Sequence, residues 1–315
     1  MSPQSGIELI TGASGFIGRR LRRPNSRVLV RTSTGAQNES VGDLLVPASL
    51  EVACSGVDIV FHCAGYAHAF TSSDASAHRR INFEGTRNLL RAAADTGVRR
   101  LVFLSSVKAM ADPGLNCGDE SLPGVPETPY GLAKRAAEDA VLEFGAKHGV
   151  HVTNLRLVMV YGSGGRGNLE RMARGIAAGW FPPLPETGNR RSLVHVQDVV
   201  DVARLVAGSP KANGKTYVIA GPRAYSGREI YDAIREAVGI PSPRWHVPSW
   251  LLRTAGMLGD ALGTAVHRPF PLNSEAVNRL LDSAFYSSAR IEAELGWRAT
   301  ISLTDGIREM LGCQN

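Results

Sequence analysis

The side chains of Tyr130 and Lys134, four residues apart, form the pair in the 315-residue sequence best suited to proton transfer. On a helix this spacing places both side chains on one face. Tyrosine, with an ordinary pKa of about 10, is a poor base at neutral pH, but a neighbouring cation favours the phenolate. The pair could then exchange a proton with an alcohol oxygen. Ser105 and Ser106 lie upstream, and we predict that Ser106, with Ser105 as the alternative, holds the reacting oxygen.

Three glycines near the N-terminus, Gly12, Gly15 and Gly18, form a second pattern with chemical meaning. They follow a strand-like apolar run and open a helical segment. Gly12 permits a tight turn, Gly15 lets the backbone approach a pyrophosphate, and Gly18 lets the helix pack closely on the strand. The N–H groups at the helix start would face the phosphates, so we predict a dinucleotide site. The same loop contains Ser14, Phe16 and Ile17.

The elements that must position these residues alternate regularly up to about residue 160. Short runs that are β-branched and apolar on both faces are typical of parallel strands covered by helices. Such runs are Ile7–Thr11, Arg27–Val30, Asp58–Cys63, Arg100–Ser105 and His151–Val160. Helices are expected over Ala77–Thr96 and Tyr130–His148. This alternation predicts an α/β fold with a Rossmann-type doubly wound parallel sheet.

Glycines and prolines become frequent after Tyr161, and the pattern changes. The elements expected there are a strand at Ser192–Val196, a helix at Gln197–Ala207, a strand at Tyr217–Ala220 and a helix from Ser226 to about Val238. Ser226 and Glu229 have the spacing of a capping box at the start of that last helix. We expect residues 1–160 to form a dinucleotide-binding domain and residues 161–315 mainly a smaller mixed substrate lobe. The boundary is soft, because the chain can cross back to the first domain.

The composition narrows the possible partners. The net charge is +6, and the 35 basic residues form no block with interleaved aromatics, so no nucleic-acid partner is expected. A modest positive excess suits a small anionic substrate. No apolar run is long enough for a membrane span, so no integral membrane segment is expected. Trp250–Leu262 comes nearest, but Arg253 and Asp260 interrupt it. We interpret it as an amphipathic helix packed in the fold, with membrane contact as the alternative.

The spacing of cysteines and histidines indicates no metal site. Cysteines stand at positions 54, 63, 117 and 313, and none is spaced as CxxC. We therefore expect free thiols in a reducing compartment and, in the absence of a signal-peptide pattern, a cytoplasmic protein. Tyr66, His68 and His78 are expected to line a cleft without binding metal.

The segment Thr11-Gly-Ala-Ser-Gly-Phe-Ile-Gly18 resembles the extended short-chain dehydrogenase/reductase superfamily, in its NAD-dependent epimerase/dehydratase branch. The resemblance runs from Ile7 to about Thr304. Its further landmarks are Gly42-Asp-Leu44, Phe61-His-Cys-Ala-Gly65, Asn82-Phe-Glu-Gly-Thr-Arg-Asn88, Leu104-Ser-Ser-Val107, Tyr130-Gly-Leu-Ala-Lys134, Val160-Tyr-Gly162, Arg191-Ser-Leu-Val-His-Val-Gln-Asp198 and Leu295-Gly-Trp297. The members that it resembles most are bacterial UDP-sugar 4-epimerases and 4-ketoreductases.

The resemblance implies a nicotinamide cofactor and further residues around it. Asp43 would accept a hydrogen bond from the adenine amino group, although Asp43 could equally be a turn residue. Leu44, Ala64 and Gly65 would line the cofactor. Lys134 would anchor the nicotinamide ribose. The lysine and the positive nicotinamide together would lower the pKa of the catalytic tyrosine.

Arg31 leaves the choice between NAD and NADP open. The second predicted strand ends at Arg31, where a carboxylate would accept hydrogen bonds from the adenosine ribose of NAD. An arginine can instead pair with the 2′-phosphate of NADP, and hydroxyls from Thr32, Ser33 and Thr34 could add donors. Alternatively, Arg31 stacks on the adenine or faces solvent.

The resemblance places the substrate in the second lobe. Arg191 resembles the family arginine that pairs with the diphosphate of a nucleotide sugar, a role that suits a planar, permanently charged guanidinium. Arg190 could share this role, and Arg279 is a second candidate. Asn168 should either cap a helix or contact the substrate. Met159 stands where many sugar epimerases carry asparagine, so their sugar contacts do not transfer directly.

Three activities are compatible with these residues. The preferred one is a UDP-hexose 4-epimerase, in which C4 hydride moves to the cofactor and returns on the other face of the sugar. The alternative is an NADPH-dependent 4-keto-6-deoxy sugar nucleotide reductase; both would serve polysaccharide biosynthesis. A hydroxysteroid or sterol dehydrogenase is a further alternative, disfavoured because a neutral sterol needs no phosphate clamp such as Arg190 and Arg191. A regulator without chemistry is disfavoured because Tyr130 and Lys134 are both present. We expect a homodimer.

Overall fold

The computed structural model describes residues 6–66, 75–165, 167–266, 270 and 273–312. Its main element is a seven-stranded sheet in the order β3-β2-β1-β4-β5-β6-β9, with every neighbouring pair parallel. The strands are β1 (Ile7–Thr11), β2 (Ser26–Val30), β3 (Glu39–Val41), β4 (Val57–His62), β5 (Arg100–Ser106), β6 (His151–Leu157) and β9 (Lys215–Ile219). The strand order reverses between β1 and β4, so the predicted doubly wound Rossmann-type sheet is confirmed.

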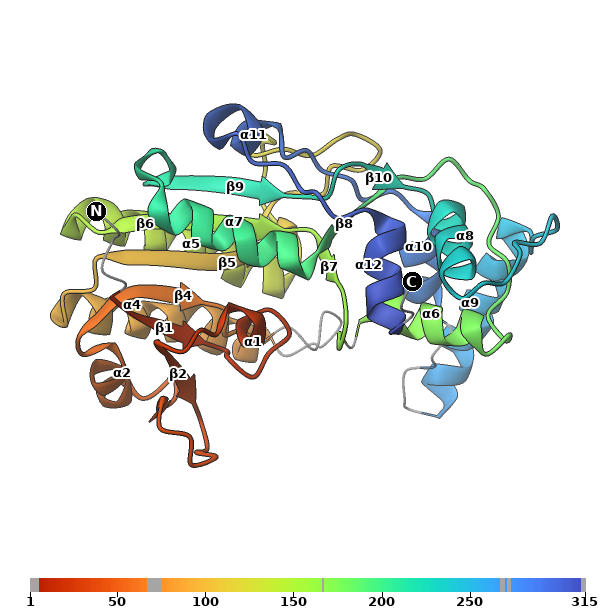
Figure 1. Ribbon diagram of the computed structural model, residues 1–315. Helices are drawn as coiled ribbons and strands as arrows, with labels where there is room; N and C mark the ends of the chain where they lie inside the picture. The colour runs from red at the N-terminus through yellow and green to blue at the C-terminus, as the bar shows by residue number, and fades with distance from the viewer. Residues whose placement is uncertain (1–5, 67–74, 166, 267–269, 271–272, 313–315) are drawn as a thin grey trace.

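Helices cover both faces of this sheet (Figure 1). They include α1 (Gly18–Leu21), α2 (Pro47–Cys54), α4 (Gly85–Asp95), α5 (Pro129–His148) and α7 (Val196–Gly208). On one face Val202 and Val206 of α7 share a core with Leu155 of β6. On the other face α2, α4 and α5 enclose a second core, which includes Leu89 and Val141. Because apolar residues fill both cores, the strands are apolar on both sides, as their sequences indicated.

A three-stranded sheet in the order β10-β8-β7 belongs to the smaller, mixed lobe. Its strands are β7 (Met159–Tyr161), β8 (Arg191–His195) and β10 (Ala224–Tyr225). The helices α6 (Asn168–Ala177), α8 (Gly227–Ala237), α9 (Ser249–Ala265), α10 (Ser274–Leu281) and α12 (Leu303–Leu311) gather in this lobe, whereas α11 (Ala289–Leu295) contacts β9 (Figure 1). After residue 160 the chain runs from β8 through α7 to β9, so it contributes to both sheets.

The predicted capping box is present at the start of α8. The Ser226 hydroxyl accepts from the N–H of Glu229 at 3.0 Å, and the Glu229 carboxylate accepts from the N–H of Ser226 at 2.8 Å. Each side chain satisfies a backbone donor that the helix itself cannot pair, which fixes the first turn.

The segment Ala77–Thr96 is not the single α-helix that its sequence predicted. It contains the end of α3 (Ala75–His78), a π-helical segment at Arg79–Glu84 and then α4. Asn82 lies in the π-helical segment, where its side chain accepts from the N–H of Tyr66 at 2.7 Å and donates to the Tyr66 carbonyl at 3.0 Å. This segment contacts α5, and π-helical insertions are frequent at functional sites.

The predicted strand His151–Val160 is wrong in its second half. It divides into β6 of the large sheet and β7 of the small one, with Val158 between them. The N–H of Val158 still donates to the Ile219 carbonyl of β9 at 3.2 Å, and the chain leaves the large sheet immediately afterwards. The division carries the chain from the seven-stranded sheet into the three-stranded sheet.

Candidate active site

Tyr130 lies in the first turn of α5, next to the end of β5. Thr128 caps this helix by accepting from the N–H of Gly131 at 3.1 Å, and Pro129 occupies the first helical position. The Tyr130 side chain is 6% exposed and hydrogen-bonds to the Ser106 hydroxyl. The structure therefore brings together two of the predicted catalytic residues.

Lys134 lies one turn further along α5 and is also buried. Its Nζ donates to the Leu104 carbonyl of β5 at 2.9 Å and lies 4.5 Å from the centre of the Phe103 ring. Burial lowers the pKa of the Lys134 ammonium to about 8, although the Glu138 carboxylate opposes this change. The ammonium is thus held in a fixed position by β5.

The pKa of the Tyr130 hydroxyl is raised in the chain alone, whereas the sequence analysis predicted a lowered pKa for the site with both Lys134 and the nicotinamide present. Burial raises its pKa to about 12, and the Ser106 hydrogen bond only partly opposes that effect. Removing the phenol from water disfavours its charged form. The chain by itself therefore keeps Tyr130 protonated, and a further cation at the site is needed to favour the phenolate.

Ser105 and Ser106 differ in their surroundings. Ser106 bonds to Tyr130, and its hydroxyl oxygen accepts from the N–H of Lys108 at 3.2 Å. Ser105 is 5% exposed, and its hydroxyl has no hydrogen-bond partner within the described chain. A buried hydroxyl without a partner is costly. These contacts favour Ser106 as the residue that shares the reacting oxygen with Tyr130 and leave the Ser105 hydroxyl free to bond a bound group.

The glycine loop is shaped as a dinucleotide cradle. Gly12 has a φ of +67°, and a Cβ there would lie 2.7 Å from the backbone nitrogen of Ala64. A Cβ on Gly18 would lie 2.2 Å from the Gly12 carbonyl oxygen. A side chain at Gly12 would therefore separate the loop from the chain after β4, and one at Gly18 would separate the start of α1 from the loop. In the described residues no acceptor is recorded for the N–H groups of Phe16 and Ile17, which fits them for phosphate oxygens. The residues present therefore fit the diphosphate of a dinucleotide.

The residues predicted to line the rest of the cofactor lie in two places, the turn at Asp43 and Leu44 and the segment of Ala64 and Gly65. Asp43 accepts from the N–H of Leu45 at 2.8 Å, which is an Asx turn, so the turn role that we left open for it is present. Leu44 is buried beside this turn. A Cβ on Gly65 would lie 3.0 Å from the Asn82 amide oxygen and 3.7 Å from Lys134 Nζ. Ala64 and Gly65 thus connect the glycine loop with Lys134.

Arg31, immediately after β2, is exposed, and no hydrogen bond or ion pair is recorded for it within the described chain. The hydroxyls of Ser33 and Thr34 donate instead to the Glu39 carboxylate, at 2.8 and 2.6 Å. These bonds hold the pKa of Glu39 at about 2. Two of the hydroxyls predicted to support a 2′-phosphate are therefore already engaged by an acidic residue that the sequence analysis missed.

Arg191 is the first residue of β8, and its side chain is partly exposed. It donates through Nη1 to the Asp282 carbonyl at 2.9 Å, and burial lowers its pKa. Among the other substrate candidates, Arg190 stacks over the Phe285 ring at 4.4 Å, and Arg279 forms an ion pair with Glu275. Asn168 is exposed as the first residue of α6 and makes no side-chain cap. Arg191 is the candidate most constrained by its surroundings.

Buried histidines surround the catalytic pair. His78 is 1% exposed, and its ring lies edge-on to Tyr130 and tilted against Tyr66, with ring centres 5.6 and 5.2 Å apart. His62, which the sequence analysis missed, bonds to Thr11 at 2.7 Å and to Thr86 at 2.9 Å. Burial lowers the pKa of His62 to about 3, so this ring is neutral. His68 lies outside the described residues.

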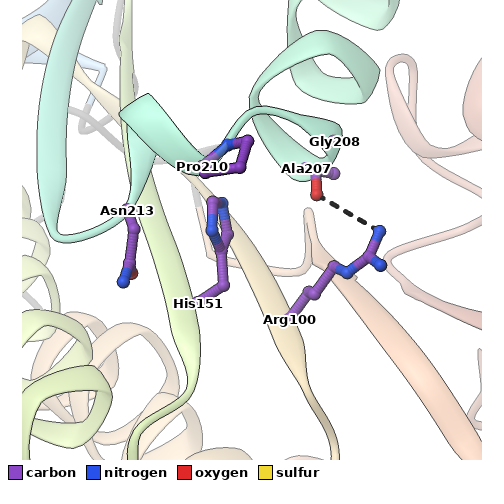
Figure 2. Close-up of a pocket in the computed structure, with 6 residues that line it drawn as sticks. All are labelled: Arg100, His151, Ala207, Gly208, Pro210 and Asn213. Carbon is purple, nitrogen blue, oxygen red and sulfur yellow. Dashed lines mark hydrogen bonds between the residues drawn. The ribbon is translucent and has the colours of Figure 1, made fainter.

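The small hollow drawn in Figure 2 is distinct from this site. Arg100 and His151, the first residues of β5 and β6, line it together with residues from the end of α7 and the turn that follows. Tyr130 lies at the opposite, carboxyl edge of the sheet, where parallel α/β folds bind their ligands. We therefore assign no catalytic role to the hollow.

The described residues offer neither a metal cluster nor a membrane-spanning helix. No group of three or more His, Cys, Asp or Glu side chains there is arranged to hold a metal ion. None of the helices in that part of the chain is long and apolar enough to cross a membrane. The three cysteines that can be described, Cys54, Cys63 and Cys117, are free thiols.

Comparison with known proteins identifies relatives that match almost the whole chain. The model of the NAD dependent epimerase/dehydratase family matches residues 8–220. The chain is 28% identical to a UDP-glucose 4-epimerase of Vibrio cholerae, over 96% of this chain and 93% of the relative. It is 26% identical to an N-acetyl-α-D-glucosaminyl-diphospho-ditrans,octacis-undecaprenol 4-epimerase of Escherichia coli O157:H7, with the same coverage. A solved structure described as MoeE5 in complex with UDP-glucose and NAD is 26% identical, covers 98% of both chains and superposes with a TM-score of 0.76.

Proposed function

The chain belongs to the NAD dependent epimerase/dehydratase family and is an enzyme of the extended short-chain dehydrogenase type with a nicotinamide cofactor, and from this premise we propose that it is a UDP-hexose 4-epimerase. The observation that carries the proposal is the placement of Ser106, Tyr130 and Lys134 at the carboxyl edge of the sheet. A Cβ on Gly65 would lie 3.7 Å from Lys134 Nζ, and the preceding residue, Ala64, lies close against Gly12 of the glycine loop. A dinucleotide on that loop would present its nicotinamide to Tyr130.

The proposed reaction divides between the cofactor and the chain. When bound, the nicotinamide accepts hydride from C4 of the sugar and returns it. Tyr130 takes the proton of the 4-hydroxyl and later gives it back, while Ser106 holds the same oxygen. Lys134, fixed by the Leu104 carbonyl, adds a positive charge beside the site. Burial raises the pKa of Tyr130 to about 12 in the chain alone, and a positively charged nicotinamide bound beside it would lower that pKa.

The substrate proposal depends on Arg191. Its partly exposed guanidinium uses one bond for the Asp282 carbonyl, and its remaining donors suit a diphosphate. The Vibrio cholerae relative is a UDP-glucose 4-epimerase, and MoeE5 was solved with UDP-glucose, which supports a UDP-hexose. A sterol dehydrogenase is disfavoured, because a neutral substrate would make no use of the guanidinium donors that Arg191 leaves unbonded.

The second candidate is the NADPH-dependent 4-keto-6-deoxy sugar nucleotide reductase. The exposed Arg31 at the end of β2 favours it, because an arginine there can pair with a 2′-phosphate. Glu39 favours NAD instead, because its carboxylate engages the neighbouring hydroxyls and repels phosphate. We therefore propose NAD as the cofactor. A cytoplasmic location and a homodimer are further proposals, the former supported by the free thiols.

The cofactor in the purified protein and the product that it forms test this proposal together. An epimerase should retain NAD and convert UDP-glucose into UDP-galactose without added cofactor. Protein that retains no dinucleotide and reduces a 4-keto sugar nucleotide only with added NADPH would favour the reductase.

Arg31→Asp tests which dinucleotide, NAD or NADP, the chain prefers to bind. If Arg31 pairs with a 2′-phosphate, the aspartate should lower NADP affinity by about 10–100-fold, because a charge-assisted bond is lost and a repulsive charge is added. NAD affinity should be unchanged or improved. Titration with NADP and with NAD measures the ratio of the two affinities. Arg171→Asp, on the exposed side of α6, is the control. An unchanged NADP/NAD ratio would show that Arg31 faces elsewhere.

Arg191→Ala tests the substrate proposal. Loss of a charge-assisted bond, worth about 1.5–3 kcal/mol, should weaken UDP-sugar binding about 10–100-fold and leave cofactor affinity nearly unchanged. UDP should compete with substrate in the wild type and compete poorly in the variant. Arg223→Ala, which removes an exposed partner of Glu229 in the same lobe, is the control. Failure of UDP to bind the wild type would contradict a nucleotide-sugar substrate and would favour a sterol or another alcohol as the substrate.

A further inference from the structure

A buried ion pair lies one helical turn beyond Lys134. Glu138 of α5 is 2% exposed and Arg156 of β6 is 7% exposed. Arg156 Nε donates to both carboxylate oxygens of Glu138 at 3.1 Å, and its Nη2 donates to Oε2 at 2.7 Å. Because apolar side chains in such a place would often give an equally stable fold, a buried pair is weak evidence for stabilisation alone. Its position beside Lys134 points to a role at the candidate site.

Glu138 and Lys134 share one face of α5. They are the buried charged residues of this helix, and their four-residue spacing separates the two Cβ atoms by about 5–6 Å. A glutamate and a lysine at this spacing commonly form a direct ion pair. Here Lys134 Nζ donates instead to the Leu104 carbonyl at 2.9 Å, and no bond between Lys134 and Glu138 is recorded in the described chain. Arg156 thus holds the Glu138 carboxylate toward β6.

This arrangement leaves donors of Lys134 available to a bound group. An ammonium has three N–H donors, and the Leu104 carbonyl takes one of them. A direct bond to Glu138 would take a second donor. Because Arg156 engages both oxygens of Glu138, that carboxylate supplies negative charge near Lys134 without occupying one of its donors.

Lys134 has few charged neighbours in the described residues. Burial lowers its pKa to about 8, and the Glu138 carboxylate opposes that change. The other titratable side chains around it are His62 and Cys63 at the end of β4, Tyr130 on α5, His78 against the Tyr130 ring, and Arg156 bonded to Glu138. Burial lowers the pKa of His62 to about 3 and raises the pKa of Cys63 and of Tyr130 to about 12, which leaves all three uncharged at neutral pH. Glu138 is therefore the anionic side chain that acts on Lys134 in this part of the chain.

We propose that Glu138, held by Arg156, is a positioning residue that keeps the buried Lys134 ammonium charged and leaves its donors to the cofactor. Since the charge of Lys134 is lost as pH rises through its pKa, Glu138 extends the pH range in which the ammonium can bind. Arg156 acts one step further away, because it prevents a direct bond between Glu138 and Lys134. The proposal rests on the proposed role of Lys134 in cofactor binding, but the charge of Lys134 can be measured without the cofactor.

Titration of the lysine side chains by NMR tests the proposal in the cofactor-free protein. The chain contains five lysines, so ¹³C-labelled lysine gives few signals, and Lys134→Met identifies the signal of Lys134. Glu138→Gln keeps an oxygen that can accept from Arg156 and removes the negative charge. The midpoint of the Lys134 titration should then be lower than in the wild type by about one pH unit or more. Arg156→Met should raise this midpoint, because Glu138 can then bond to Lys134 directly.

NAD affinity gives a second readout. In Glu138→Gln the affinity should match that of the wild type at about pH 6 and should fall through the lower midpoint as pH rises. In Arg156→Met it should be about tenfold weaker throughout this pH range, because Glu138 takes one donor of Lys134. A merely structural defect would not shift the two midpoints in opposite directions, and low pH would not restore the affinity.

Glu8→Gln is the matched control, because Glu8 is a buried glutamate of β1 that pairs with Arg204 at 2.9 Å. Its Lys134 midpoint should equal that of the wild type. Glu138→Gln combined with Arg156→Met removes both charges and avoids an unpaired buried arginine, so it replaces Glu138→Gln if circular dichroism shows that the single variant is unfolded. The midpoint should also be lower in the double variant, since Glu138 is the charge that acts on Lys134.

Unchanged Lys134 midpoints in Glu138→Gln and in the double variant would overturn the proposal. An equal shift in Glu8→Gln would overturn it as well, because the shift would then follow from the loss of any buried ion pair. A lower midpoint together with unchanged NAD affinity would contradict the cofactor-binding role of Lys134, whereas the dependence of its charge on Glu138 would be confirmed.

Discussion

Tyr130→Phe is expected to lower kcat by a factor of about 10²–10⁴, the usual contribution of a positioned proton-transfer group. The phenylalanine keeps the ring against His78 and removes only the hydroxyl that bonds to Ser106. Cofactor affinity should therefore stay close to that of the wild type. Steady-state turnover of UDP-glucose and titration of NAD measure the two quantities.

Tyr161→Phe is the matched control for this substitution. Tyr161 is also buried, and its hydroxyl donates to the Ser302 carbonyl at 3.2 Å rather than to Ser106. Its loss should cost about 1 kcal/mol of stability and little activity. Near-wild-type turnover in Tyr130→Phe would contradict the proposed proton transfer.

Lys134→Met is expected to lower kcat by at least a similar factor and to weaken cofactor binding about 10–100-fold. Methionine fills a similar volume, but it cannot donate to the Leu104 carbonyl or to a ribose hydroxyl. Lys147→Met, an exposed lysine on the same helix, should affect neither quantity. Normal cofactor affinity in Lys134→Met would contradict the ribose-anchoring role.

The pH dependence of cofactor binding gives Lys134 a second signature. Burial lowers the pKa of its ammonium to about 8, so the positive charge is present below that pH and is lost as pH rises through it. Wild-type affinity should therefore fall above about pH 8. Lys134→Met lacks the titrating group and should show no such fall. A parallel fall in both proteins would assign the titration to another group.

The large sheet was predictable because its central strands are buried on both faces. β1, β4 and β5 lie within one residue of the predicted runs, since their apolar sequences have few alternatives to a covered parallel sheet. β3 was missed because it has three residues, none of them fully buried. The π-helical segment was missed because the contact between Asn82 and Tyr66 that accompanies it joins residues 16 positions apart.

The candidate site was predictable in its residues more than in its electrostatics. The Tyr130 and Lys134 spacing needs only helical geometry, and the glycine loop needs only a strand and a helix on either side. The raised pKa of Tyr130 depends on burial, which tertiary packing decides. The role of Glu39 was missed because Ser33 and Thr34 lie six and five positions before it, and their contact depends on the turn before β3.

The fate of the hydrogen on C4 tests the central claim most directly. UDP-glucose carrying deuterium at C4 is given to the purified protein without added reductant, and the sugar nucleotides are analysed by mass spectrometry and NMR. Since one site removes and returns the same hydride, the account predicts UDP-galactose that retains deuterium at C4. No UDP-galactose, or UDP-galactose that has exchanged its deuterium for solvent hydrogen, would contradict it.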